Sequence, residues 1–152
     1  PGPESLLSRI GTILGLDGNK MSKSRGNTIE LGMTADETAK LLKRAVTDSD
    51  RHITYDPVNR PEVSNLVNIT AMCLDRTPED VAEEIGDGGG GGLKKLATAA
   101  VNDHFASHRA FRAELMADPS ALRDVLRAGN ERANAVAEAT LAEVRQAMSM
   151  DY

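Results

Sequence analysis

Apolar residues recur at intervals of three and four through most of this chain, and this spacing favours an α-helical fold. The segments that follow the pattern are residues 34–46, 62–74, 77–85, 93–116 and 119–148. The last two are long, amphipathic and joined by a short Asp-Pro turn. We therefore expect them to form an antiparallel hairpin, around which the earlier helices close a bundle.

Other segments depart from this pattern. Residues 12–14 predict a short strand, although no partner strand is evident in the sequence, and residues 4–10 predict a short helix. Residues 88–92 are all glycine, which loses much conformational freedom on ordering, so they predict a flexible connector. Gly129 interrupts the last helical segment and predicts a bend or a break there.

Composition limits the core and the setting of the protein. The 152 residues include two Phe, two Tyr and no Trp, so the core must be built from aliphatic side chains. The net charge of −5 argues against broad nucleic-acid binding but leaves room for a local basic face. With no apolar run of membrane-spanning length and no signal peptide, we expect a cytoplasmic protein without a membrane partner. The single Cys73 suits a small core residue in a reducing compartment, and a start at Pro1 rather than Met favours a fragment or processed piece.

The segment from Gly15 to Asn27 carries most of the candidate chemistry, because it combines cations, hydroxyls and glycines without helical or strand periodicity. Glycines permit tight turns in which backbone N–H groups converge on an anion. The charged and hydroxyl side chains are Lys20, Ser22, Lys23, Ser24 and Arg25. Together these groups predict a surface loop that binds a polyphosphate. The alternative is a basic loop that contacts only solvent.

Two further groups of polar residues have alternative interpretations. Lys40, Lys43 and Arg44 fall on the outer side of the first helical segment, where they either contact solvent or help the loop to meet an anionic ligand. His104 and His108 stand one helical turn apart, but no third zinc ligand is evident, so we expect packed or surface histidines and no metal site. No Gly-x-Ser-x-Gly turn or Cys–His pair indicates a covalent catalyst.

The five residues from Lys20 to Ser24 spell Lys-Met-Ser-Lys-Ser, the second signature of class I aminoacyl-tRNA synthetases. With the preceding Gly-Leu-Asp-Gly and the following Arg-Gly-Asn, the loop resembles that of tryptophanyl-tRNA synthetases. Weaker similarities follow in the same order, at Thr47-Asp48, Tyr55-Asp56-Pro57, Pro61-Glu62-Val63-Ser64-Asn65-Leu66 and Glu131-Arg132-Ala133-Asn134. The chain is thus similar to the C-terminal half of these enzymes.

The resemblance implies a mostly α chain: a helical bundle of the anticodon-binding type, residues 32–152, after the end of a Rossmann-like α/β catalytic domain, residues 1–31. It implies an aminoacyl-tRNA ligase that activates tryptophan with ATP and transfers it to tRNA(Trp). Mg²⁺ would arrive with ATP and have no protein ligand. The tryptophan pocket would lie outside this chain, and the full-length enzyme would be a homodimer.

The resemblance also implies roles for individual residues. Lys20 and Lys23 match the catalytic lysines that hold the triphosphate and stabilise charge on the departing pyrophosphate. The implied ATP-binding residues are Lys20, Met21, Ser22, Lys23 and Ser24, with Met21 as an apolar anchor. Gly15, Asp17 and Gly18 would shape the loop. The other ATP signature of the family, His-x-Gly-His, is absent, so the chain as it stands is not expected to catalyse adenylation alone.

These observations leave three hypotheses about function. The favoured one is the C-terminal portion of a working tryptophan–tRNA ligase. The second is a non-catalytic tRNA-binding or regulatory paralogue that retains the phosphate loop. The third is a helical protein, outside the family, whose basic loop binds another phosphate ligand.

Overall fold

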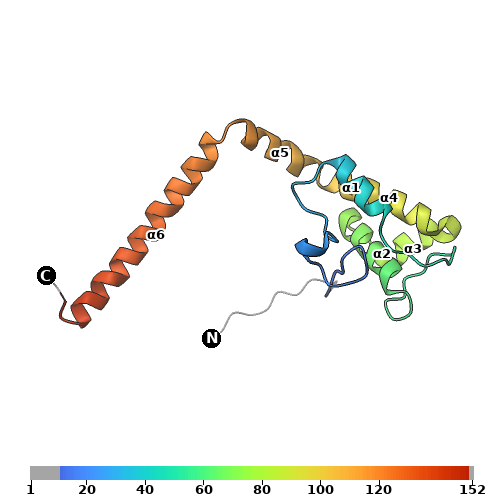
Figure 1. Ribbon diagram of the computed structural model, residues 1–152, viewed down its shortest axis with the longest axis horizontal. Helices are drawn as coiled ribbons and strands as arrows, with labels where there is room; N and C mark the ends of the chain where they lie inside the picture. Colours follow the sequence, from blue (N-terminus) through green and yellow to red (C-terminus); the bar gives the residue numbers. More distant parts are fainter. Residues whose placement is uncertain (1–10, 151–152) are drawn as a thin grey trace. The chain divides into compact units, whose positions relative to one another are not determined.

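The structure, a computed structural model, describes residues 11–150, whose regular secondary structure is entirely helical. The elements are η1 (Lys23–Arg25), α1 (Ala35–Lys43), α2 (Pro61–Leu74), α3 (Pro78–Ile85), η2 (Gly86–Gly88), α4 (Gly89–His104), α5 (Ala106–Ala117) and α6 (Ser120–Ala147) (Figure 1). The predicted mostly α fold class is confirmed. The short helix predicted at residues 4–10 lies outside the described residues.

The chain divides into two compact units, Pro1–Arg109 and Ala110–Tyr152, and each is described by itself below. The boundary between residues 31 and 32, which the resemblance implies, separates a catalytic from an anticodon-binding domain. That boundary divides the chain by function, whereas the two units divide it by compactness, so the boundary stays a prediction.

Side-chain caps fix where two helices of the first unit begin. The hydroxyl of Thr34 accepts a hydrogen bond from the Glu37 amide at 3.2 Å, and the Glu37 carboxylate accepts one from the Thr34 amide at 2.8 Å. That second bond is the main reason why the pKa of Glu37 lies below its ordinary value. Thr77 caps α3 in the same way, through the amide of Asp80 at 3.2 Å. These caps satisfy amides that have no partner within their helix.

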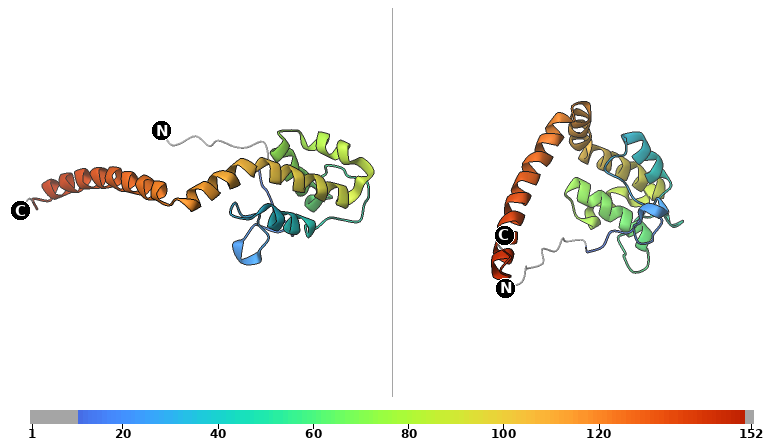
Figure 2. Two further views of the ribbon diagram at one scale, coloured as in Figure 1. Left: turned by 90° about the horizontal axis from the view of Figure 1, so that it is seen from above. Right: turned by 60° about the vertical axis from the view of Figure 1, so that its left-hand side comes forward.

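The core of the first unit forms where α4 packs between α1 on one side and α2 and α3 on the other (Figure 2). Its largest fully buried apolar side chains are Leu42, Ile53, Val63, Leu66, Val67, Val81, Leu93 and Val101. The prediction of an aliphatic core is therefore confirmed for the described residues. Phe105 and Cys73 pack against its edge, and burial raises the pKa of the Cys73 thiol.

The strand predicted at residues 12–14 is wrong, because this segment has irregular backbone. A side chain takes the place of a neighbouring strand. The Asn65 amide oxygen accepts a hydrogen bond from Leu14 N at 2.8 Å, and its Nδ2 donates to Leu14 O at 3.1 Å. Asn65 lies on α2, so this pair of bonds ties the chain entering the candidate loop to the helical core.

The flexible connector predicted at residues 88–92 is also wrong, since these glycines form the end of η2 and the first turn of α4. Close packing explains why glycine is needed there. A Cβ on Gly90 would lie 2.7 Å from Thr47 Oγ1, and Gly89 is buried with a φ of +66°. The sequence pattern indicated the entropic cost of glycine but not this close approach of α4 to the segment after α1.

We predict opposite results for alanine at two neighbouring glycines of α4. Gly91→Ala should raise the free energy of unfolding by about 0.5–1 kcal/mol, because a Cβ there meets no atom within 4 Å and alanine restricts the unfolded chain. Gly90→Ala should lose this gain through its contact with Thr47. Urea unfolding of both variants measures the difference, and a truly flexible connector would give equal values.

The single helix predicted over residues 93–116 is interrupted at Phe105, between α4 and α5. The second unit contains the rest of α5 and the 28-residue α6, which continues through Gly129 without the predicted break. None of its described residues is buried. The predicted hairpin would pair α6 with a helix that begins in the first unit, so it stays a prediction. Within residues 11–150, no helix combines the length and apolar character needed to cross a bilayer.

A forked ion pair holds the segment between α1 and α2. Arg60 Nε and Nη2 donate to the two Asp48 carboxylate oxygens at 2.7 and 2.8 Å, while Nη1 donates to the carbonyl of His52 at 2.7 Å. The Arg60 side chain is 12% exposed. The guanidinium lowers the pKa of Asp48, chiefly by hydrogen bonding. This ion pair fixes the segment between α1 and α2. In that segment Thr47 lies against Gly90, and Val46 N donates to the carbonyl of Leu16 in the candidate loop.

The lowered pKa of Asp48 predicts a pH-dependent contribution to stability. The contribution is complete above the ordinary aspartate pKa of about 3.9 and is lost as pH falls through the lower folded value. Asp48→Asn should lower the free energy of unfolding by about 1–2 kcal/mol at neutral pH, an amount reduced by partial exposure, and by less near pH 3. Urea unfolding at the two pH values tests this. An equal loss at both would contradict it.

Candidate phosphate-binding loop

The candidate loop leaves and rejoins the first unit at a closed base. Leu16 N donates to Asn27 O at 3.0 Å, and Gly15 N donates to Asn19 O at 2.7 Å. Leu16 is 8% exposed and belongs to the hydrophobic core, while its carbonyl accepts from Val46 N at 2.8 Å. Backbone bonds and one buried leucine thus anchor the loop at its start and its end.

The side chain of Asn27 holds the interior of the loop together. Its Nδ2 donates to Asp17 Oδ1 at 2.7 Å and to Lys20 O at 3.2 Å, and its Oδ1 accepts from Ser22 N at 2.8 Å. Asn27 is 4% exposed. An amide side chain offers both donors and an acceptor, so it can join three points of a turn. Sequence reasoning placed Asn27 at the end of the segment but gave it no role; a polar residue closing a glycine-rich loop was the available signal.

Gly15, Asp17 and Gly18, predicted to shape the loop, all lie at this base. The pKa of Asp17 is lowered, mainly by the Asn27 amide and next by the backbone N–H of Asn19, so the carboxylate is charged at neutral pH. A Cβ on Gly15 would lie 2.3 Å from Asn27 Nδ2. Gly18 has a φ of +78°, a left-handed conformation that favours glycine.

The tip of the loop presents its cations to solvent. Lys23 and Arg25 bound η1, Lys20 lies just before it, and all three are exposed. Within residues 11–150 neither lysine forms an ion pair. Ser22 Oγ and Ser24 Oγ lie 2.8 Å apart, beside the lysines. Positive charge and hydroxyl groups are thus gathered at one end of the loop, where a polyphosphate could reach them.

The side chain of Met21 is 42% exposed in this chain, and the anchoring role that the resemblance implies for it stays a prediction. Leu16, in contrast, is buried at the base of the loop. Met21 likewise stays an ATP-binding residue only as a prediction.

A small pocket of about 200 Å³ opens beside the loop, and it contains cations from two elements. Arg25 contributes from the loop and Arg44 from the C-cap of α1, while the acidic residue Asp17 also lines the pocket. The predicted basic face on the first helical segment consists of Lys40, Lys43 and Arg44. Arg44 lines the pocket beside the loop, Lys43 lines a different cavity, and Lys40 lines neither. These three cations therefore do not line one common pocket.

The histidine pair contacts an aromatic ring. The rings of His104 and His108 meet that of Phe105 edge-on, at centroid distances of 4.9 and 6.3 Å. Within the described residues, no three His, Cys, Asp or Glu side chains gather as a metal site would require.

Comparison with known proteins shows which family the chain belongs to. The profile described as "tRNA synthetases class I (W and Y)" matches residues 1–106. The chain belongs to this family. It is 40% identical over 151 residues to a tryptophan–tRNA ligase of Thermosynechococcus vestitus, a match that covers 95% of this chain and 46% of the relative. A tryptophan–tRNA ligase of Neisseria meningitidis is 36% identical, over 93% of this chain and 42% of its own.

A solved structure agrees with the sequence comparisons. The tryptophanyl-tRNA synthetase of Campylobacter jejuni, solved with ADP and tryptophan, matches with a TM-score of 0.75 and 28% identity, over 93% of this chain and 44% of its own. The resemblance to tryptophanyl-tRNA synthetases is thus confirmed. The chain spans about half the length of the curated relatives it matches.

We predict that Asn27→Ala opens the base of this synthetase loop. The Ser22 amide should exchange its hydrogen at least about tenfold faster, since its acceptor is gone, and the pKa of Asp17 should rise toward the ordinary value. NMR exchange and carboxyl titration measure both. Ser24→Ala is the control, because it removes a contact of the tip and leaves the base intact. Unchanged exchange at Ser22 would show that Asn27 does not hold the loop.

Proposed function

We propose that this chain supplies the ATP loop and the helical part of a tryptophan–tRNA ligase, which activates tryptophan with ATP and transfers it to tRNA(Trp). The observation that carries the proposal is a loop with the synthetase signature whose base is hydrogen-bonded and whose lysines are exposed and unpaired within residues 11–150. The curated relatives carry the name tryptophan–tRNA ligase, which supports the choice of amino acid.

In this proposal the tip of the loop contributes electrostatic stabilisation. Lys20 and Lys23 hold the triphosphate and offset the charge that develops on the departing pyrophosphate, while Ser22 and Ser24 donate hydrogen bonds to phosphate oxygens. No covalent intermediate on this chain is needed. Arg25 and Arg44, which share the neighbouring pocket, add positive potential beside the phosphates.

Mg²⁺ is proposed to arrive with ATP, where it neutralises charge on the phosphate oxygens. The loop fits this arrangement because its one carboxylate, Asp17, already accepts hydrogen bonds from Asn27 and Asn19 at the base. The chain's own residues then position the nucleotide without holding the metal.

The remaining parts of the proposal follow from the family. Residues 1–31 are proposed to end the catalytic domain, and residues 32–152 to form the anticodon-binding domain. The tryptophan pocket and the contacts of a homodimer are assigned to the half of the relatives' length that this chain does not match. The cytoplasm, where tRNA is charged, is the proposed location.

A hybrid ligase tests the proposal. In it, this chain replaces the corresponding 46% of the Thermosynechococcus vestitus ligase. We expect the hybrid to exchange pyrophosphate into ATP in the presence of tryptophan. A hybrid that binds tRNA(Trp) without such exchange would favour the non-catalytic paralogue, and one that binds neither ATP nor tRNA would contradict both.

Within this hybrid, Lys23→Ala should slow pyrophosphate exchange at saturating tryptophan by about 100-fold and change the KM for tryptophan less than about threefold. The reason is that the Lys23 contact forms chiefly as pyrophosphate departs. Lys40→Ala, an exposed lysine outside the loop, is the matched control. An unchanged rate for Lys23→Ala would remove this residue from catalysis.

A further inference from the structure

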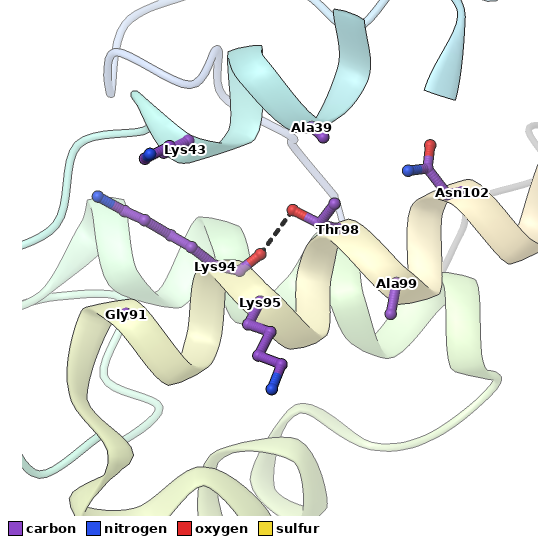
Figure 3. A pocket seen from close by; sticks show the side chains of 8 residues that line it. All are labelled: Ala39, Lys43, Gly91, Lys94, Lys95, Thr98, Ala99 and Asn102. Atoms are coloured by element: carbon purple, nitrogen blue, oxygen red, sulfur yellow. Dashed lines mark hydrogen bonds between the residues drawn. The ribbon is translucent and has the colours of Figure 1, made fainter. Parts of the chain in front are cut away.

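A second basic cavity, separate from the loop, lies between α1 and α4 (Figure 3). Its volume is about 500 Å³. The lining residues are Ala39, Lys43, Gly91, Lys94, Lys95, Thr98, Ala99 and Asn102. The two helices are joined at one end of this groove by a hydrogen bond from Asn102 Nδ2 to Ala35 O at 3.2 Å. We call this cavity the α1–α4 groove.

Every charged side chain that lines the α1–α4 groove is a lysine. Lys43 comes from α1, whereas Lys94 and Lys95 come from α4. Within residues 11–150 none of these lysines forms an ion pair, and none of the described lining residues is acidic. The chain carries a net charge of −5, whereas the described lining of this groove carries a net positive charge from its three lysines. Such a surface attracts an anionic partner.

The lining of the groove also includes small apolar side chains. Ala39 and Ala99 contribute methyl groups from the two helices, and the hydroxyl of Thr98 already donates to Lys94 O at 2.7 Å. A ligand at this surface therefore meets both apolar groups and ammonium groups. That combination suits a sugar–phosphate backbone, whose ribose can contact the apolar groups while its phosphates meet the lysines.

The groove is distinct from the site of ATP. Lys43 and Arg44 are consecutive at the end of α1, yet Lys43 lines the groove and Arg44 lines the small pocket beside the candidate loop. Neighbouring residues of one helix thus supply cations to two different places. A single nucleotide bound by the loop leaves the groove unexplained.

We propose that the α1–α4 groove binds the phosphodiester backbone of an RNA strand, with Lys43, Lys94 and Lys95 each facing a phosphate. The proposal deepens the proposed function and rests on it, because that function is what brings a tRNA to this chain. Lysine is a point charge without the fork that reads a base edge, so these contacts hold the RNA without selecting its sequence.

Titration of a labelled tRNA(Trp) transcript with the full chain, followed by fluorescence anisotropy at several salt concentrations, tests the groove. We expect Lys43→Gln, Lys94→Gln and Lys95→Gln to weaken binding by about 3- to 10-fold each at about 100 mM salt. The triple variant should weaken it by about 30-fold or more and reduce the slope of log affinity against log salt by about 2.

The matched control is Lys40→Gln, which removes the same charge from α1 at a position outside the groove. It should change affinity less than about twofold. Thermal unfolding checks that every variant keeps its fold. A second triple variant, with arginine at the three positions, keeps the positive charge and should retain the affinity for tRNA. If the lysines acted only by supporting the fold, arginine would not restore the affinity.

Three outcomes would overturn the proposal. If the unsubstituted chain binds tRNA and the triple glutamine variant binds equally well, the groove is wrong while the proposed function stands. If polyglutamate, used as a probe, loses its binding in the triple variant while tRNA does not, the groove serves an acidic protein segment instead. If the unsubstituted chain binds no RNA, the groove fails together with the tRNA partner, whereas pyrophosphate exchange by the hybrid still reports on the loop.

Discussion

Two asparagine side chains connect the candidate loop to the helical core, and the rest of the site depends on them. Asn65 on α2 bonds both backbone groups of Leu14, as a neighbouring strand would do. Asn27 then bonds three points inside the loop. Both are buried, at 6% and 4% exposure, so water competes poorly for their amides. The loop is therefore fixed at its base by two side chains, one from its own last residue and one from α2.

The helical unit fixes the same base from the other side. The carbonyl of Leu16 is bonded by Val46, which follows α1, and Gly18 lies over Glu62 at the start of α2. The segment between α1 and α2 is itself held by the fork of Arg60 on Asp48. Contacts far apart in the chain thus converge on a few residues of the loop, while within residues 11–150 the ammonium groups of Lys20 and Lys23 form no ion pair.

The sequence predicts the features that depend on local chemistry. Helical periodicity and the aliphatic core follow from residue types and spacing, and the loop signature leads to the correct family. Features that depend on distant partners were not predictable in this way. The place of Asn65 opposite Leu14 joins residues 51 positions apart, and the need for glycine at Gly90 is explained by Thr47, which lies beside it in the fold. Local patterns indicated a strand and a flexible connector there, because neither partner is visible from spacing alone.

The distribution of charge links the two sites that this chain offers to anions. A net charge of −5 would repel a nucleic acid at long range if it were spread evenly. Local groups of cations nevertheless occur, at the tip of the loop and along the α1–α4 groove, and the consecutive residues Lys43 and Arg44 contribute to the two places. In the proposed arrangement this local positive charge steers an RNA strand to the groove rather than to the whole surface. Since Lys43 ends α1 and Arg44 is its C-cap, a shift of this one helix would change the potential at the proposed nucleotide site and at the proposed RNA site together.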